Sequence, residues 1–474
     1  MSSGIDTITR TEANHASSTL PTEKGDIRVL LVYLFLFYLS FGIINPVNVE
    51  LFEKINSALD SVDPNHHPAS STKHSTSLYG FLFALPGVIF FFVSPITGNL
   101  SDRFGRKPFL TIFAAIYTTI YGIYFLLCRV VTTTSHSSLS NFELMIRNNA
   151  LYLYIFAKIL QGFCMDVIPM INSYIADHAD KKDLTLYFSY VLAIMGLSTA
   201  IGPIMSGSIY KQFGLNYVFG TIFGISIFTT CFILFILKEN AKGNKTLNNV
   251  DTPKKDSKSF FSEISAPFKS LFMIVTQADA ALKSLIISKF TSAFISVGFF
   301  CIITQFTRLK FGYGPQENGF VLTLVGITAI LSNSILAKPI AYLSGSESNN
   351  LVVAGIANAL LFVSCVLTRN GDCFYYGMAF FLLGAKEDPL RSSLISKVFD
   401  PNQQGILNGC LGSITTLGRI LAPVMFSFLL DVFTTSSSLP HVVDAPFIAM
   451  TLIQLIGVAF LWRAKRLIDQ NKNE

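Results

Sequence analysis

The chain has 474 residues, of which 51% are hydrophobic and only 14% charged, and its mean hydropathy is +0.52. Soluble domains carry about 25% charged residues, so this composition excludes a soluble globular protein and indicates a membrane protein. The formal net charge is +6. Because the cations gather in particular loops, as the positive-inside rule predicts, a nucleic-acid partner is not expected.

The chain begins with a polar stretch, 1–28, which lacks the apolar core of a signal peptide and is predicted to be a cytoplasmic tail. The first apolar helix is predicted at 29–49. Near its far end, Pro46 removes a backbone hydrogen bond and is flanked by Asn45 and Asn48. The helix therefore either bends over a wet cavity, which the two asparagines would line, or simply ends there.

Two further apolar runs, 78–96 and 109–127, are each long enough to span a bilayer core. Residues 51–77 and 130–148 are expected to form outer loops. The link at 98–108 is rich in glycine and cations, which predicts a tight connection at the cytoplasmic face. Its candidate gate residues are Gly98, Asp102, Arg103, Gly105, Arg106 and Lys107.

The remaining apolar runs complete a set of twelve predicted helices. They lie at 151–175, 184–210, 217–237, 283–307, 316–340, 351–367, 373–396, 405–430 and 442–462. The sequence thus predicts an all-α membrane protein with twelve transmembrane helices in two six-helix bundles, 29–237 and 283–462. A polar cytoplasmic linker, 238–282, would join the bundles, and 463–474 would be a cytoplasmic tail.

Several predicted helices contain charged side chains. A charge near mid-bilayer costs about 2.5–3.5 kcal/mol, so such residues usually line a cavity and pair with one another. The charged candidates are Lys158, Asp166, Lys289, Lys386, Glu387, Asp388, Arg391 and Arg419. For Arg419, a function in transport and a role in locking helices together are both open. For the cluster at 386–391, a role in transport is favoured, because four charges and a proline in six residues exceed what helix packing requires.

These charges suggest how protons and solute are handled. Glu387 and Asp388 lie four and three residues before Arg391, so either acid could neutralise it locally. Asp166 has no cation within one turn, and desolvation raises the pKa of a carboxyl, as a proton carrier requires. Proton coupling is therefore assigned to Asp166, Glu387 or Asp388. The substrate-cavity candidates, Asn45, Asn48, Lys158, Lys289, Lys386, Arg391 and Arg419, have a cationic surplus that favours an anionic solute.

The predicted fifth helix contains Gly202, Pro203 and Gly207. Small residues at this spacing permit close helix contact, and proline bends a helix. Packing alone would explain them.

Three motifs resemble signatures of the major facilitator superfamily. The pattern G-x-L-x-D-R-x-G-R-K at 98–107 matches its loop signature, and 202–207 looks like the core of its antiporter signature. Residues 158–162 resemble a helix-four signature, R-x-x-Q-G, with Lys158 in place of arginine. Asp177 matches an acid that joins the loop's charge relay. The resemblance implies a cytoplasmic latch that favours the outward-facing state, made of Asp102, Arg103, Arg106 and Asp177.

Two subfamilies compete within this resemblance. Residues 176–177 and 396–405 look like the tetracycline/proton antiporter group, whereas Asp166 and residues 389–397 are similar to the proton-coupled folate transporter family.

The sequence thus predicts a proton-coupled secondary transporter of a small organic solute that works by alternating access. The alternatives are a proton antiporter that exports lipophilic or cationic compounds and a non-transporting receptor or scaffold. No nucleophile, base or metal grouping indicates an enzyme, and no cofactor or metal is expected. The protein is predicted to be a monomer in the lipid bilayer of the plasma membrane or an acidic organelle, with both termini in the cytoplasm.

Overall fold

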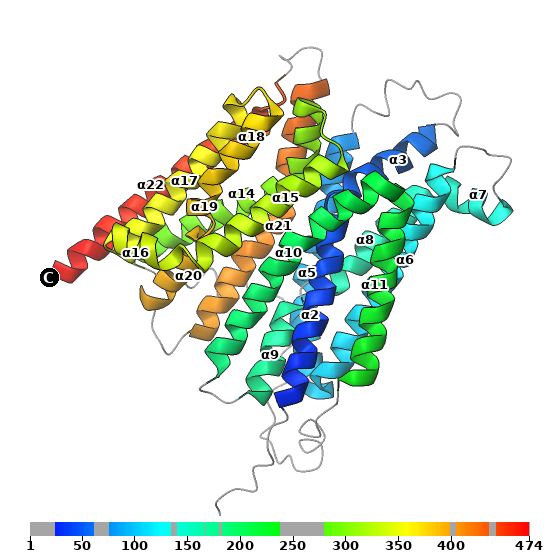
Figure 1. Ribbon diagram of the computed structural model, residues 1–474. Coiled ribbons are helices and arrows are strands. Elements are labelled where there is room, and N and C mark those ends of the chain that lie inside the picture. Colours follow the sequence, from blue (N-terminus) through cyan, green and yellow to red (C-terminus); the bar gives the residue numbers. More distant parts are fainter. Residues whose placement is uncertain are drawn as a thin grey trace, which may run out of the picture.

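The computed structural model describes residues 24–60, 75–133, 140–165, 167–179, 183–237, 279–398, 404–435 and 442–473. All the regular elements in these ranges are helices, so the predicted all-α class is confirmed. The helices form an N-terminal and a C-terminal bundle (Figure 1).

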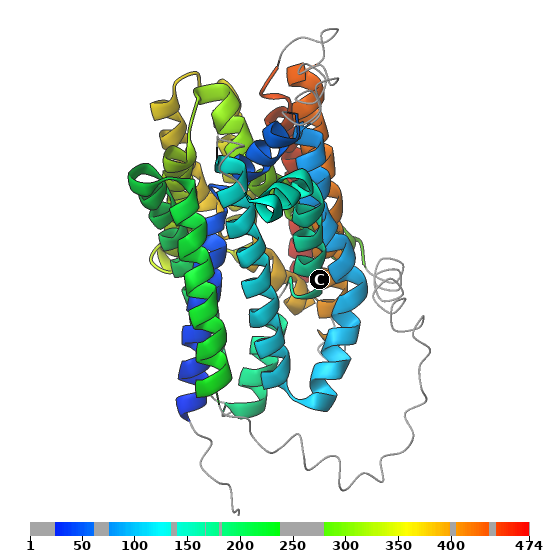
Figure 2. The ribbon, with the colours of Figure 1, turned by 90° about the vertical axis from the view of Figure 1, so that its right-hand side faces the viewer.

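The N-terminal bundle contains α2 (Lys24–Ile44), α3 (Asn48–Asp60), α5 (Ser75–Phe104), α6 (Arg106–Thr132), α7 (Asn141–Asn148), α8 (Ala150–Phe163), α9 (Ile168–His178), α10 (Leu184–Phe213) and α11 (Leu215–Ile236). Its long helices run nearly parallel, as the side view in Figure 2 shows. The C-terminal bundle contains α14 (Ala280–Phe311), α15 (Pro315–Asn333), α16 (Ala337–Ser344), α17 (Glu347–Leu367), α18 (Gly371–Gly377), the 3-10 helix η3 (Met378–Phe380), α19 (Phe381–Gly384), α20 (Glu387–Val398), α21 (Gln404–Thr435) and α22 (Ala445–Asn473).

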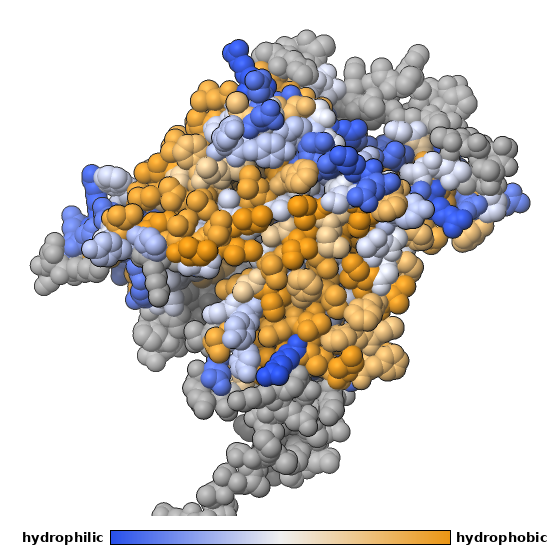
Figure 3. Space-filling view, viewed as in Figure 1, coloured by the Kyte–Doolittle hydropathy of each residue, from blue (hydrophilic) through white to orange (hydrophobic). Residues whose placement is uncertain are grey.

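Ten of the described helical segments are long and apolar enough to cross a membrane. Apolar side chains form a broad band over the middle of the surface, and hydrophilic ones gather toward its ends (Figure 3). Two predicted spans are not among the ten. The span at 316–340 corresponds to α15 and the start of α16, and the span at 373–396 is broken into α18, η3, α19 and α20.

Two segments that were expected to be outer loops contain helices. Helix α3 covers 48–60, and α7 begins at a capping box in which Ser140 and Glu143 bond each other's backbone N–H. Both helices are amphipathic and short. A search for long apolar runs therefore misses them.

Two helices break where a single one was expected. Helix α2 ends at Ile44, and the chain turns through Pro46 before α3 begins. The predicted helix at 151–175 is divided into α8 and α9, and Pro169 lies in the first turn of α9, where its missing N–H is tolerated.

The link between α5 and α6 is shorter than the sequence suggested. The helices extend to Phe104 and from Arg106, so only Gly105 is not helical, and its φ of 93° lies in the region that favours glycine. We call the end of the molecule that carries this link the Gly105 end and the opposite end the α3 end.

The bundles meet along two helix pairs, α10 with α15 and α5 with α21. The first pair is very close: a Cβ built on Gly319 would lie 2.5 Å from the carbonyl oxygen of Pro203, and one on Gly326 would lie 2.8 Å from Cα of Ala200. At the α3 end, Ser77 donates a hydrogen bond of 2.6 Å to Asp431 across the other pair. Toward the Gly105 end, the bundles diverge in Figure 1.

Candidate functional site

A cavity of about 70 Å³ lies within the N-terminal bundle. Three of the predicted cavity residues meet in its wall: Asn45, Asn48 and Lys158. The other lining residues are Phe41, Ile44, Phe83, Pro86, Tyr117, Ile120, Tyr121, Tyr124, Gln161 and Met165. The cavity is thus lined mainly by aromatic and aliphatic side chains, with one cation and three amide side chains.

The break between α2 and α3 positions the asparagines. Because the helix ends at Ile44, Asn45 lies in the turn and Asn48 begins the next helix, and both reach the cavity. Asn48 donates a hydrogen bond of 3.1 Å to the Tyr79 hydroxyl and accepts one of 3.3 Å from Tyr154. The sequence left two interpretations of this segment open, a helix end and a bend over a cavity. The structure combines them: the helix ends, and the asparagines after its end line a cavity.

The cation of the cavity belongs to Lys158 on α8, which is 5% exposed. Its Nζ lies 5.3 Å from the ring centre of Tyr154, 5.9 Å from that of Phe83 and 6.0 Å from that of Tyr124. Within the described residues it has no ion pair with a carboxylate. Aromatic faces attract a desolvated cation by about 2 kcal/mol, and this stabilises the ammonium without neutralising its charge.

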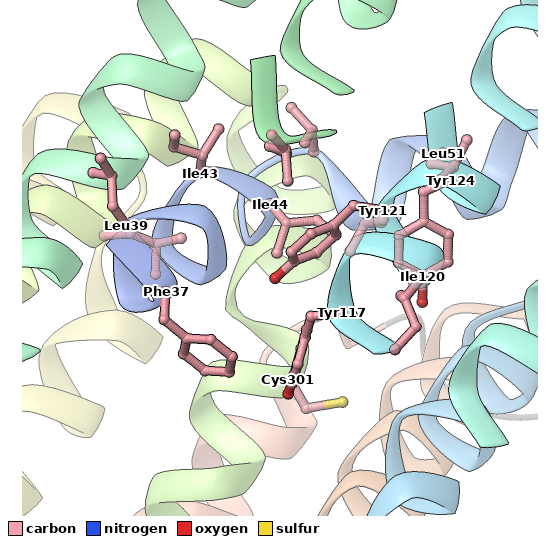
Figure 4. Close-up of a cluster of buried hydrophobic side chains, with 14 of the residues drawn as sticks. Phe37, Leu39, Ile43, Ile44, Leu51, Tyr117, Ile120, Tyr121, Tyr124 and Cys301 are labelled. Atoms are coloured by element: carbon pink, nitrogen blue, oxygen red, sulfur yellow. The ribbon is translucent and has the colours of Figure 1, made fainter. Parts of the chain in front are cut away.

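Three tyrosines of α6 were not singled out from the sequence. Tyr117, Tyr121 and Tyr124 follow helical spacing, and in Figure 4 they lie among the side chains of the buried cluster that also includes Cys301 of α14. The Tyr124 hydroxyl is buried and has no hydrogen-bond partner among the described groups. Their i, i+4, i+7 spacing was the available signal.

The charges at 386–391 are divided between two environments. Glu387 and Arg391 are buried inside the C-terminal bundle, 3% and 0% exposed, and form the predicted ion pair. Asn358 of α17 and Gln454 of α22 donate to the second oxygen of Glu387, at 2.5 and 3.0 Å. The Nε of Arg391 donates to Ser288 of α14 at 2.9 Å. Neither charge lines the cavity described above.

Asp388 points out of this network, and its side chain is 57% exposed. It accepts a hydrogen bond of 2.5 Å from Lys289 of α14, which is itself buried, and lies 3.6 Å from Arg391. Lys386 is also buried, and its Nζ has no hydrogen-bond partner within the described part of the chain. Arg419 is half-buried on α21, beside Gly87 of α5, where the bundles meet.

Some of the predicted site residues lie outside the described residues. This applies to Asp166, the proton-coupling candidate, and to the side chains of three gate residues, Asp102, Arg103 and Asp177. Of the rest, Gly98 lies in α5 and Lys107 in the first turn of α6. Arg106 donates a hydrogen bond of 2.7 Å to the Ser101 hydroxyl across the Gly105 link.

The three residues singled out in the predicted fifth helix, Gly202, Pro203 and Gly207, lie on α10 and contact two different helices. Gly202 lies against α2 within its own bundle, and a Cβ there would lie 2.7 Å from Cα of Gly42. Gly207 lies against α15 of the other bundle, where a Cβ would lie 3.0 Å from Cα of Gln316. Pro203 contacts both sides. Close packing, as predicted, accounts for all three.

A second, larger cavity of about 360 Å³ lies between the bundles at the α3 end. Its wall is formed by Pro46, Val49, Glu50, Tyr210, Thr304, Arg308, Gly312, Tyr313, Gly314, Pro315 and Asn318. Glu50 accepts a hydrogen bond of 2.8 Å from the Tyr210 hydroxyl. No residue of this wall other than Pro46 had drawn attention in the sequence.

Comparisons with known proteins agree with this architecture. Multidrug resistance protein 2 of Bacillus subtilis (strain 168) is 24% identical over 456 residues, which are 94% of this chain and 96% of that protein. The class H tetracycline resistance protein of Pasteurella multocida is 24% identical over 357 residues, 74% and 79% of the two chains. The crystal structure of the human organic anion transporter MFSD10 (TETRAN) superposes with a TM-score of 0.62 at 18% identity, covering 93% of this chain and 100% of that one.

A sequence profile of the Major Facilitator Superfamily matches residues 30–387, three quarters of the chain. The ten apolar helices and this match make the protein an integral, multi-pass membrane protein. The chain belongs to the Major Facilitator Superfamily, whose members are transporters of small molecules.

Proposed function

We propose that this transporter moves a small organic anion with an aromatic or apolar body, in a proton-coupled cycle of alternating access. Solute would bind at the cavity of Lys158 in the N-terminal bundle. The C-terminal bundle would handle the proton. Both termini would face the cytoplasm, which makes the Gly105 end the inner face and the α3 end the outer face, and the protein would work as a monomer in the plasma membrane or an acidic organelle.

The observation that carries the solute class is the environment of Lys158. Its ammonium is desolvated, faces aromatic rings and lacks a carboxylate partner within the described residues. A buried cation without a counter-ion is expensive, and an anionic ligand would supply that counter-ion. The Tyr124 hydroxyl and the amide of Gln161 offer hydrogen bonds, and the rings offer apolar surface.

The charge balance of the C-terminal bundle supports proton coupling. Lys289 and Arg391 are matched there by Glu387 and Asp388. Uptake of one proton would leave this group with a net positive charge in a buried environment. That change would favour a different arrangement of α14 and α20. Asp388, the more exposed acid, is the better placed to exchange protons, and Asp166 remains a further candidate for the same role.

Flux into proteoliposomes tests this function. Purified protein would be given a panel of organic anions, cations and neutral solutes under an imposed pH gradient. We expect anion flux that depends on the gradient, is lost in Lys158→Gln and is partly kept in Lys158→Arg. Lys211→Gln, an exposed lysine at the end of α10, is the matched control and should transport normally. Equal flux in Lys158→Gln and the parent protein would refute the assignment.

Export of lipophilic or cationic compounds in exchange for protons is the second candidate. It is supported by the relatives named multidrug and tetracycline resistance proteins and by the helix-five residues. In the same assay it predicts cation or dye flux opposite to the proton gradient, with Lys158→Gln improving the binding of cations. Saturable binding of a panel member with no net flux would instead indicate a receptor or scaffold.

A further inference from the structure

We infer that Glu53 and Arg308 are gate residues of the transport cycle, because their ion pair joins the two bundles at the α3 end, beside the larger cavity. This inference rests on the proposed alternating-access function and adds residues that no motif of the sequence had indicated. Breaking the pair would let the bundles separate at the α3 end.

The pair connects different bundles. Glu53 lies on α3 of the N-terminal bundle and Arg308 in the last turn of α14 of the C-terminal bundle. Their side chains are 36% and 50% exposed, so water reaches them from the surface. Arg308 also lines the cavity of about 360 Å³, so the pair lies at the edge of that cavity.

Both partners are attached to stiff supports. On the N-terminal side, Glu50 lies one turn before Glu53 and is bonded to Tyr210 of α10, which ties α3 to that long helix. On the C-terminal side, α14 is capped by Gly312, with a φ of 73°, and its Lys310 is bonded at 2.6 Å to Asp444 in the segment that precedes α22. The ion pair therefore transmits force between whole bundles rather than between two loops.

The surroundings of Glu53 make the pair responsive to the outer pH. The charged and titratable groups that face Glu53 are Arg308 of α14, Tyr79 of α5, and Glu50 and Lys54 of its own helix. Burial raises the pKa of Glu53, and the attraction of Arg308 lowers it by a smaller amount. A carboxyl with a raised pKa takes up a proton at a higher pH than an ordinary glutamate does, and the protonated carboxyl no longer forms an ion pair. Acid at the α3 end thus favours opening.

A distance measurement across the α3 end tests the gate without requiring flux. The exposed Cys373 of α18 supplies one spin-label site in the C-terminal bundle, and Ser57→Cys on α3 supplies the other. The second exposed thiol, Cys231, and Cys410 are replaced by serine. Double electron–electron resonance on the full chain in lipid nanodiscs then reports the separation of the bundles.

We expect Glu53→Gln and Arg308→Gln to increase the ratio of long to short distances about two- to fivefold, the range for a half-exposed ion pair. The charge-swapped variant Glu53→Arg with Arg308→Glu should restore the parent distribution. Lowering the pH should lengthen the distance in the parent protein but not in Glu53→Gln. Glu347→Gln, which removes an exposed ion pair with Lys397 inside one bundle, is the control and should change nothing.

An unchanged distribution in both single variants would overturn the gate assignment. If the distances respond as expected but no solute is transported, the gate stands and the proposed function fails. If flux persists in Glu53→Gln with unchanged distances, the function stands and the gate fails.

Discussion

Gly202 of α10 and Gly42 of α2 touch through their backbones, so closely that a Cβ on Gly202 would lie 2.7 Å from Cα of Gly42. The same helix touches the opposite bundle through Gly207 a turn and a half later. One face of α10 therefore stabilises its bundle, while another face forms the surface between the bundles. Substitutions on the two faces should have different consequences.

Gly202→Val should destabilise the protein. The added side chain would meet backbone atoms that cannot rotate away, and overpacking of this kind costs about 1–3 kcal/mol. The thermal unfolding midpoint of the purified protein should fall, as measured by light scattering or tryptophan fluorescence. Gly224→Val is the matched control, because a Cβ at Gly224 of α11 has no neighbour within 4 Å. Equal unfolding midpoints for the two variants would contradict close backbone contact between Gly202 of α10 and Gly42 of α2.

Gly319→Val should act on conformation rather than on bundle stability. A Cβ at Gly319 would lie 2.5 Å from the carbonyl oxygen of Pro203, across the interface between the bundles. The bundles can relieve this overlap by moving apart. We expect longer distances between the spin labels at Ser57→Cys and Cys373, with an unfolding midpoint close to that of the parent protein. A large drop in the midpoint with no change in distance would show that the interface does not open.

Glu387→Gln should be among the most destabilising single changes. It leaves the guanidinium of Arg391, which is 0% exposed, without its buried counter-ion, and such losses cost about 3–5 kcal/mol. Asp388, at 3.6 Å, compensates only in part. The double variant Glu387→Gln with Arg391→Met removes both charges and should recover much of the lost stability. The free energy of unfolding would be measured by chemical denaturation for each single variant and for the double variant. If the losses of the two single variants simply added in the double variant, Glu387 and Arg391 would not be a tightly coupled pair.

The N-terminus of helix α7 should lose stability in acid. The backbone N–H and the hydroxyl of Ser140 both bond Glu143 and lower the pKa of its carboxyl below the ordinary value of about 4.3. The stabilisation is present above that ordinary value and is lost as the pH falls through the lower folded-state pKa. The protection factors of the amides in 141–148, which correct for the intrinsic pH dependence of exchange, should fall over that window. In Glu143→Gln this loss of protection should disappear, whereas a persistent acid effect would point to another group.

The sequence predicted much of the fold because apolar length alone identifies most membrane helices. It also grouped Asn45, Asn48 and Lys158 as cavity residues, since polar groups at bilayer depth need a polar or wet neighbour. The ion pairs of Arg391 with Glu387 and Asp388 followed from helical spacing.

Other features depend on information that spacing does not contain. The pair of Glu387 and Arg391 turned out to be enclosed by α14, α17 and α22, because the rotation of a helix about its axis is set by its neighbours. Helices α3 and α7 were missed because they are amphipathic and short. The pairing of Glu53 with Arg308 joins residues 255 positions apart, and no local pattern could reveal it.

Helix α16 follows α15 in the C-terminal bundle, and it presents Tyr342 and Leu343 outward, 88% and 82% exposed. In a bilayer, an amphipathic tyrosine ring such as that of Tyr342 settles at the level of the lipid headgroups, whereas leucine favours the apolar layer beneath them. They are attached to the C-terminal bundle, so any tilt of that bundle carries them through this layer. Under the proposed alternating access, the lipid composition surrounding α16 would bias how readily the protein changes state.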